Sequence, residues 1–174
     1  AQDIAHRNIQ KHRCRLPHTI QRTRNEPMNS TASDTEFMKQ ALAEARKAYA
    51  EDEVPIGAVI VCKGRIIARA HNLTETLNDV TAHAEMQAIT SAAAHIGGKY
   101  LNDCTLYVTV EPCPMCAGAI GWAQLGRLVY GADDEKRGYH KYAPNALHPK
   151  TEVKNGVCSD EATALMQEFF RKRR

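Results

Sequence analysis

The sequence predicts an α/β protein with three layers, in which helices cover both faces of a mixed five-stranded sheet. Two observations support this prediction. Strand-like and helix-like segments alternate through the middle of the chain, and such units form largely parallel sheets through right-handed crossovers, with both faces covered. Ahead of them, two β-branched runs separated by a tight turn predict an antiparallel hairpin at the edge of the sheet.

The domain is predicted to open with a helix. Ser33 and Glu36 have the spacing of a capping box, in which two side chains bond the free N–H groups at a helix start. The apolar residues that follow recur at a helical period, and this pattern stops before Pro55. They are Met38, Ala41, Leu42, Ala45 and Tyr49.

The hairpin and a second helix come next. Residues 57–62 and 66–70 are predicted to be the two strands of the hairpin, with a Lys-Gly turn between them. After a loop, Thr81 is the expected N-cap of a helix over residues 82–96. Two consecutive glycines follow this helix and are expected to end it.

The remaining segments complete the alternation of strands and helices. In chain order they are a strand over 105–110, a helix from 113 to about 124, a strand over 127–131, a polar segment over 132–150, a short strand over 151–157 and a helix over 159–174. Open α/β sheets place their functional sites beyond the carboxyl ends of the strands, which is where the second and third predicted helices begin.

Size and composition fit one globular domain. The chain has 174 residues, of which 43% are hydrophobic and 25% are charged, and this length can bury a core. No window approaches the ~18 apolar residues of a membrane span. Six scattered cysteines do not form a disulfide scaffold, so we expect a reducing, cytoplasmic setting and no membrane partner. Residues 28–174 hold 17 basic and 18 acidic side chains, so any contact with nucleic acid must come from local basic patches and not from a general field.

Residues 1–33 differ from the domain that we predict over residues 34–174. They are rich in Arg, His, Asn and Gln and lack a sustained apolar period, which is typical of a poorly ordered basic extension. Three accounts are open: a transit-like targeting segment, an RNA-binding arm, or sequence upstream of a natural start at Met28. We favour the last account because the chain from Met28 onward is self-sufficient.

Two short segments carry the candidate chemistry. Cys113 and Cys116 are three residues apart, so they share one face of a helix, and a proline between them suits the first turn of that helix. His83 and Glu85 are two residues apart and can approach one ion together only from a helix start. We therefore expect two helix N-termini to converge on one cation, where the helix dipole favours thiolates.

Zinc is the cofactor that these residues indicate, one Zn²⁺ per subunit, bound by His83, Cys113 and Cys116 with one coordination position open for chemistry. A C-x-x-C pair alone would also suit a redox dithiol or a structural zinc site. The candidates for a fourth structural ligand are Cys62, Cys104, Cys158 and His95. However, H-x-E followed by P-C-x-x-C is the signature of zinc nucleobase deaminases. Glu85 is then the general acid/base, which takes a proton from water, delivers it to the adjacent ring nitrogen and later protonates the departing ammonia.

At this point the chain resembles one family, the bacterial tRNA-specific adenosine deaminases of the cytidine deaminase-like superfamily. The zinc motif is shared by the whole superfamily, whereas the Glu-Val-Pro-x-Gly-Ala start and the Phe-Phe-Arg-x-Arg-Arg end indicate the tRNA branch. The similarity runs from about Asp34 to Arg174, and it is carried by residues 53–59, 71–72, 81–86, 111–120, 129–132 and 169–174.

The resemblance implies a cytidine deaminase-like fold and zinc-dependent hydrolysis of the wobble adenosine of a tRNA to inosine. It further implies an anticodon stem-loop as the partner and a homodimer as the assembly. Asn72 would hydrogen-bond the flipped nucleoside, Val54 would line the base pocket, and the backbone of Ala84 would donate to the base. Asp134 would face the nucleotides around the target. The basic chain end would contact the RNA backbone through Arg171, Lys172, Arg173 and Arg174.

Other interpretations stay open beside this one. Asn72 could cap a turn, Val54 could be plain core, and Asp134 could belong to a solvated acidic run. At the position of Pro114 many tRNA deaminases have an aliphatic residue, whereas proline is common there among guanine and cytosine deaminases. A free nucleobase or nucleoside deaminase is therefore the alternative function. The segment over 136–150 also departs from the family pattern. A third possibility is a non-catalytic RNA-binding module with structural zinc, which would need a fourth protein ligand.

Overall fold

The structure is a computed structural model that describes residues 30–173. Most of the predicted extension, up to residue 29, lies outside the described residues, and so does Arg174. Among the helices that are described, none is long and apolar enough to cross a membrane. The elements are α1 (Ser30–Ala50), β1 (Gly57–Cys62), β2 (Arg65–His71), α2 (Ala84–Ile96), β3 (Cys104–Val110), α3 (Pro114–Trp122), β4 (Arg127–Ala132), α4 (Tyr139–Tyr142), β5 (Glu152–Lys154) and α5 (Ser159–Lys172).

The strands form a single mixed sheet in the order β2-β1-β3-β4-β5. β1 pairs antiparallel with β2 and with β3, whereas β4 pairs in parallel with β3 and with β5. A parallel pair needs a crossover connection. α3 supplies the first crossover, and the long segment that contains α4 supplies the second. The predicted five-stranded sheet with a hairpin at its edge is therefore confirmed.

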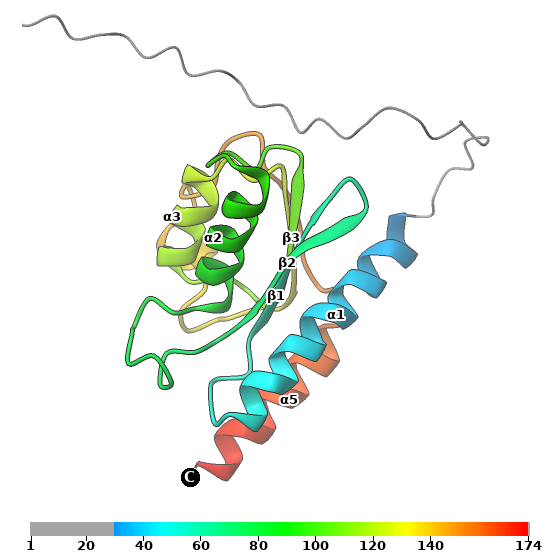
Figure 1. Cartoon of the computed structure of the whole chain (residues 1–174). Coiled ribbons are helices and arrows are strands. Elements are labelled where there is room, and N and C mark those ends of the chain that lie inside the picture. The colour runs from blue at the N-terminus through cyan, green and yellow to red at the C-terminus, as the bar shows by residue number, and fades with distance from the viewer. Residues whose placement is uncertain (1–29, 174) are drawn as a thin grey trace, which may run out of the picture.

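Helices cover both faces of this sheet (Figure 1). α1 and α5 lie side by side on one face, and α2 and α3 lie on the other. All residues of β1 are buried, because successive side chains point to opposite faces and both faces are covered. Ala58 and Ile60 pack into the core beneath α2 and α3, whereas Val59 and Val61 pack with Met38 of α1. This confirms the three predicted layers.

Several local predictions are wrong. α1 begins at Ser30, three residues before the helix start expected at Ser33. α2 begins after His83 and not after Thr81, whose N–H and hydroxyl both bond Asp79 in the preceding turn. β5 has only three residues, and α4 was not expected within the polar segment. A single turn such as α4 is too short to produce a visible helical period.

Candidate metal centre and active site

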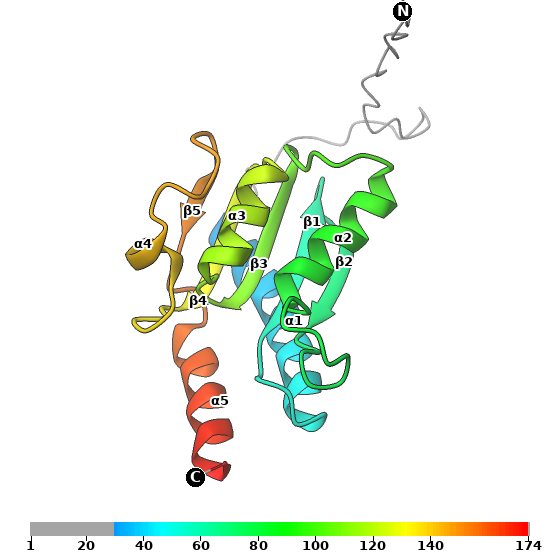
Figure 2. The same cartoon turned by 90° about the vertical axis from the view of Figure 1, so that its left-hand side faces the viewer.

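Both halves of the motif lie where helices begin. His83 is the N-cap of α2 and Cys113 is the N-cap of α3, and both have an extended backbone. Pro114 occupies the first turn of α3, where its missing N–H costs no hydrogen bond. Neither N-cap side chain forms a capping hydrogen bond, so both can face other groups. α2 and α3 are neighbours on one face of the sheet (Figure 2), and their starts converge as predicted.

Three ligating atoms meet between these helix starts. Nδ1 of His83 lies 3.5 Å from Sγ of Cys116 and 3.7 Å from Sγ of Cys113. All three atoms lie within 4.8 Å of one another, and no fourth side chain from residues 30–173 joins the group. Ligands that surround one zinc ion tetrahedrally, at about 2.0–2.3 Å each, are separated by about 3.5 Å. The group therefore fits zinc and leaves one coordination position for water or substrate.

The two thiols of this group differ in their acidity. A hydrogen bond from Cys116 lowers the pKa of Cys113 to about 4; burial opposes this shift, and the contact with His83 adds to it. The same hydrogen bond, together with burial, raises the pKa of Cys116. The hydrogen bond with Cys113 also raises the pKa of His83. Both thiols must be deprotonated before they can bind a metal ion together.

Glu85 lies in the first turn of α2 and is almost completely buried. Burial raises the pKa of its carboxyl to about 7. Its Oε2 atom is enclosed and has no hydrogen-bond partner among the described residues. Leaving a buried acceptor unpaired costs about 1–3 kcal/mol, so this oxygen suits a partner that arrives with the reaction, such as water or the substrate. A carboxyl that titrates near neutrality can act as a general acid and as a general base.

Asn72 follows β2 directly, and its amide nitrogen faces the protein. Nδ2 donates to Oγ1 of Thr74 at 3.1 Å and lies 3.5 Å from Oε2 of Glu53. The fully buried Glu53 also accepts hydrogen bonds from the Thr74 hydroxyl at 3.2 Å and the backbone N–H of Thr76 at 2.7 Å. Although burial opposes it, these bonds hold the pKa of Glu53 below its ordinary value. Glu53 therefore fixes both Asn72 and the loop that follows.

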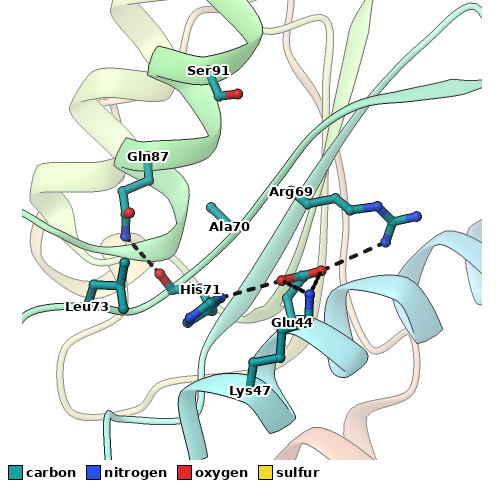
Figure 3. A pocket seen from close by; sticks show the side chains of 8 residues that line it. All are labelled: Glu44, Lys47, Arg69, Ala70, His71, Leu73, Gln87 and Ser91. Carbon is teal, nitrogen blue, oxygen red and sulfur yellow. Dashed lines mark hydrogen bonds and ion pairs between the residues drawn. The ribbon is translucent and has the colours of Figure 1, made fainter. Parts of the chain in front are cut away.

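A pocket of about 370 Å³ lies among α1, β2 and α2, and Leu73, which follows Asn72, is one of its lining residues (Figure 3). None of the three metal ligands lines it. Inside it, the buried Glu44 carboxylate lies 3.4 Å from Nδ1 of His71. Gln87 of α2 donates to the backbone oxygens of His71 at 2.7 Å and of Ala82 at 3.1 Å. These two bonds tie the end of β2, and so Asn72, to the helix that begins at the metal centre.

The other predicted base and RNA contacts occupy separate segments. Val54 is half-buried ahead of β1, and Ala84 is fully buried at the first position of α2, where a backbone N–H has no intrahelical acceptor. Asp134 lies in the loop after β4, where its Oδ1 accepts hydrogen bonds from the backbone N–H groups of Lys136 and Arg137, both at 3.0 Å. The Asp134 carboxylate therefore caps a turn, and its contact with RNA stays a prediction.

The basic end of α5 lies at the same end of the sheet as the starts of α2 and α3, but on the opposite face (Figure 1, Figure 2). Arg171, Lys172 and Arg173 are exposed. The Lys172 ammonium lies 4.5 Å from the centre of the Tyr49 ring, and the Arg173 guanidinium lies 4.5 Å from that of Phe169. Aromatic packing therefore holds two of these cations against the domain.

Comparisons with known proteins agree with this geometry. The chain matches the family model of the MafB19-like deaminases over residues 32–174. A protein of Agrobacterium fabrum strain C58, named tRNA-specific adenosine deaminase, is 46% identical over 148 residues, which cover 82% of this chain and 97% of that relative. The chain belongs to the tRNA-specific adenosine deaminases.

Two solved structures place the deaminase among its neighbours. One, from a study of A-to-I editing by tRNA:A34 deaminases at the wobble position, has a TM-score of 0.71 and 47% identity, and covers 75% of the deaminase and 99% of its own chain. The guanine deaminase of Bacillus subtilis has a TM-score of 0.55 and 46% identity, and covers 56% of the deaminase and 63% of its own chain.

Sequence reasoning missed two buried carboxylates of this deaminase. Glu53 holds Asn72, and Glu111 holds the loop that carries Asp134. The signal for Glu111 was available, because a charged residue stands directly between an apolar strand and the first cysteine. The sequence around Glu53 gave no such signal, because Glu53 accepts a hydrogen bond from the backbone N–H of Thr76, which lies 23 residues further along the chain.

Proposed function

We propose that this deaminase hydrolyses the wobble adenosine of a tRNA to inosine and ammonia, with a zinc ion held by His83, Cys113 and Cys116. The observation that carries this proposal is the group of three ligands with the enclosed, unpaired carboxylate of Glu85 beside it. Full-length similarity to named tRNA-specific adenosine deaminases supports RNA as the substrate class.

Zinc bound at this site supplies a Lewis acid, which lowers the pKa of a bound water toward about 7. The remaining proton movements belong to Glu85. Its carboxylate takes the proton of the attacking water and delivers it to the ring nitrogen beside the carbon that bears the amine. It then takes the second proton of the same water, from the hydroxyl now on that carbon, and passes it to the amine, which leaves as ammonia, so that the carboxyl ends in the state in which it began.

The substrate base must leave its stack to reach a buried carboxylate, and an anticodon loop presents unpaired bases at low cost. Asn72, held by Glu53, presents its side-chain oxygen to the nucleoside because its amide nitrogen is already bonded. Val54 lines the base pocket, and the backbone N–H of Ala84 donates to the base. Asp134 borders the neighbouring nucleotides.

An alternative function is hydrolysis of a free nucleobase, and Pro114 together with the Bacillus subtilis guanine deaminase favours it. That similarity covers 56% of the chain, whereas the tRNA deaminase of Agrobacterium fabrum covers 82%. Incubating the purified zinc-loaded protein with an anticodon stem-loop, and separately with guanine and cytidine, tests the two functions. We expect inosine from the stem-loop and no ammonia from the free compounds; ammonia from guanine alone would replace the proposal with its alternative.

The basic end of α5 is proposed to contact RNA phosphates. We expect the double variant Arg171→Gln, Lys172→Gln to raise KM for a stem-loop by about tenfold and to reduce the slope of log KM against log salt by about one or two. The matched control replaces Arg65 and Lys99, which are exposed at the opposite end of the sheet. If both double variants had equal KM values and equal salt slopes, the basic end of α5 would not contact RNA.

The homodimer is proposed to form through α3. This helix has no charged residue, and its Met115 and Trp122, seven residues apart on one face, are 37% and 86% exposed. We expect sedimentation equilibrium to find a dimer for the wild type and a monomer for Trp122→Glu, because a charge in an apolar interface is costly. Tyr100→Glu, which changes an exposed aromatic residue outside α3, should stay dimeric. A monomeric wild type would contradict the proposal.

A further inference from the structure

Glu111 is a buried charge that the reaction itself does not use. It stands between the end of β3 and Pro112, two residues ahead of the ligand Cys113, and its side chain has no exposed surface. Oε2 accepts a hydrogen bond from the backbone N–H of Asp134 at 3.0 Å. Oε1 accepts one from the backbone N–H of His140 at 3.1 Å and pairs with Nδ1 of the same residue. All three donors belong to one loop, over residues 133–140.

The backbone of this loop is wrapped closely around the carboxylate. A Cβ atom on Gly138 would lie 2.3–2.4 Å from the carboxyl atoms of Glu111, so the loop can approach this closely only with glycine there. The backbone N–H of Tyr139 donates to the Pro112 oxygen at 2.9 Å, and that of Gly138 donates to the Asp134 oxygen at 2.8 Å. The loop is therefore fixed at both ends to the segment that leads into α3.

The same loop borders the metal centre. The last two residues of the loop, Tyr139 and His140, are also the first two residues of α4, which lies beside α3 (Figure 2). Arg137 is close enough to His83 for its positive charge to act on the imidazole. Lys136 and Arg137 are exposed, while their backbone N–H groups are bonded by Asp134. The loop thus presents exposed cations from a fixed backbone at the edge of the site.

We infer that Glu111 is a positioning residue for RNA recognition, whose buried carboxylate fixes the loop over residues 133–140 beside the metal centre before RNA binds. This inference rests on the proposed function. A loop that is already ordered loses little conformational entropy when RNA binds, and this smaller entropy loss increases the affinity for RNA. Glu111 touches neither the base nor the zinc ligands' donor atoms. Its loss should therefore raise KM for RNA and leave kcat and zinc binding nearly unchanged.

Two variants disturb this contact from opposite sides. Glu111→Gln keeps the shape but turns an N–H₂ group toward backbone donors, and Gly138→Ala places a methyl group against the carboxylate. We expect each to raise KM for a stem-loop about tenfold, with kcat within about threefold, and the double variant to be no worse than either single one, because both break one contact. The control is Gly98→Ala, whose added Cβ meets no atom within 4 Å.

Amide exchange measured by nuclear magnetic resonance tests the contact without relying on activity. The amide protons of Asp134 and His140 should exchange slowly in the wild type and at least tenfold faster in both variants, which should still bind one zinc per chain. Rapid exchange in the wild type, lost zinc, or a fall in kcat at constant KM would each overturn the inference. If the wild type deaminates guanine and no RNA, the proposed function fails and the role in RNA recognition fails with it, while the exchange data still decide whether the contact exists.

Discussion

Replacing Glu85 with Gln should reduce kcat by about a thousandfold while one zinc ion per chain is retained. A positioned general acid/base contributes about 10²–10⁴-fold to a rate, and this carboxyl serves more than one proton transfer. The amide keeps the size of the side chain but cannot carry a proton between water and the ring nitrogen. Zinc retention is expected because Glu85 lies outside the group of three ligands. Ammonia release and metal analysis on the same preparation measure both quantities.

Two further variants sharpen this result. Glu161 is an exposed glutamate in the first turn of α5, so Glu161→Gln makes the same chemical change at another helix start and should leave kcat unchanged. Glu85→Asp keeps the carboxyl but withdraws it by one methylene, so an intermediate kcat is expected. Turnover by Glu85→Gln at the rate of the wild type would assign the proton transfers to another group.

The same substitution should stabilise the metal-free protein. Burial raises the pKa of Glu85 to about 7 in the folded state, whereas an unfolded glutamate titrates near about 4.3. The folded state therefore binds more protons between these values, and the wild type loses stability as pH rises through this window. Glu85→Gln lacks that loss. Its melting temperature without metal should equal or exceed that of the wild type at pH 7, so an inactive Glu85→Gln protein is not an unfolded one.

The group of three candidate ligands could be predicted from sequence because the geometry of each half of it is local. Two cysteines three residues apart, with a proline between them, define a helix start, and His83 with Glu85 defines another. The prediction that failed nearby, Thr81 as the N-cap, failed for a local reason: Thr81 bonds Asp79, so the chain is still turning and the helix begins two residues later. The position of the cap does not alter which side chains form the group of three candidate ligands.

The hydrogen bonds of Glu111 and Glu53, which hold the loops around the candidate site, could not be predicted. They join segments that are distant in sequence. Glu111 bonds His140, 29 residues later, and Glu53 bonds Thr76, 23 residues later. Local patterns carry no information about such pairs. In both cases the carboxylate is buried, and its partners are backbone N–H groups and polar side chains. Burying a charge is costly unless it is fully hydrogen-bonded, so two such carboxylates beside one site indicate loops that must hold a fixed shape.

Replacing Cys116 with Ser should remove both zinc and activity, because a serine hydroxyl is not deprotonated at neutral pH and cannot replace a buried thiolate ligand. We expect zinc content to fall from one ion per chain to less than about a tenth after dialysis against a chelator, with no measurable inosine formation. Removing zinc from the wild type should abolish activity, and adding zinc back should restore it, whereas Cys116→Ser should not recover.

Cys158→Ser is the matched control, because Cys158 was a candidate fourth ligand in the sequence and lies outside the group of three in the structure. It should keep zinc and full activity. Loss of zinc from both variants would indicate a closed structural site with four protein ligands, which leaves no position for water and is incompatible with hydrolysis. Zinc retained by Cys158→Ser and lost from Cys116→Ser is the pattern that an open catalytic site requires, since three ligands bind the ion and the fourth position belongs to the reaction.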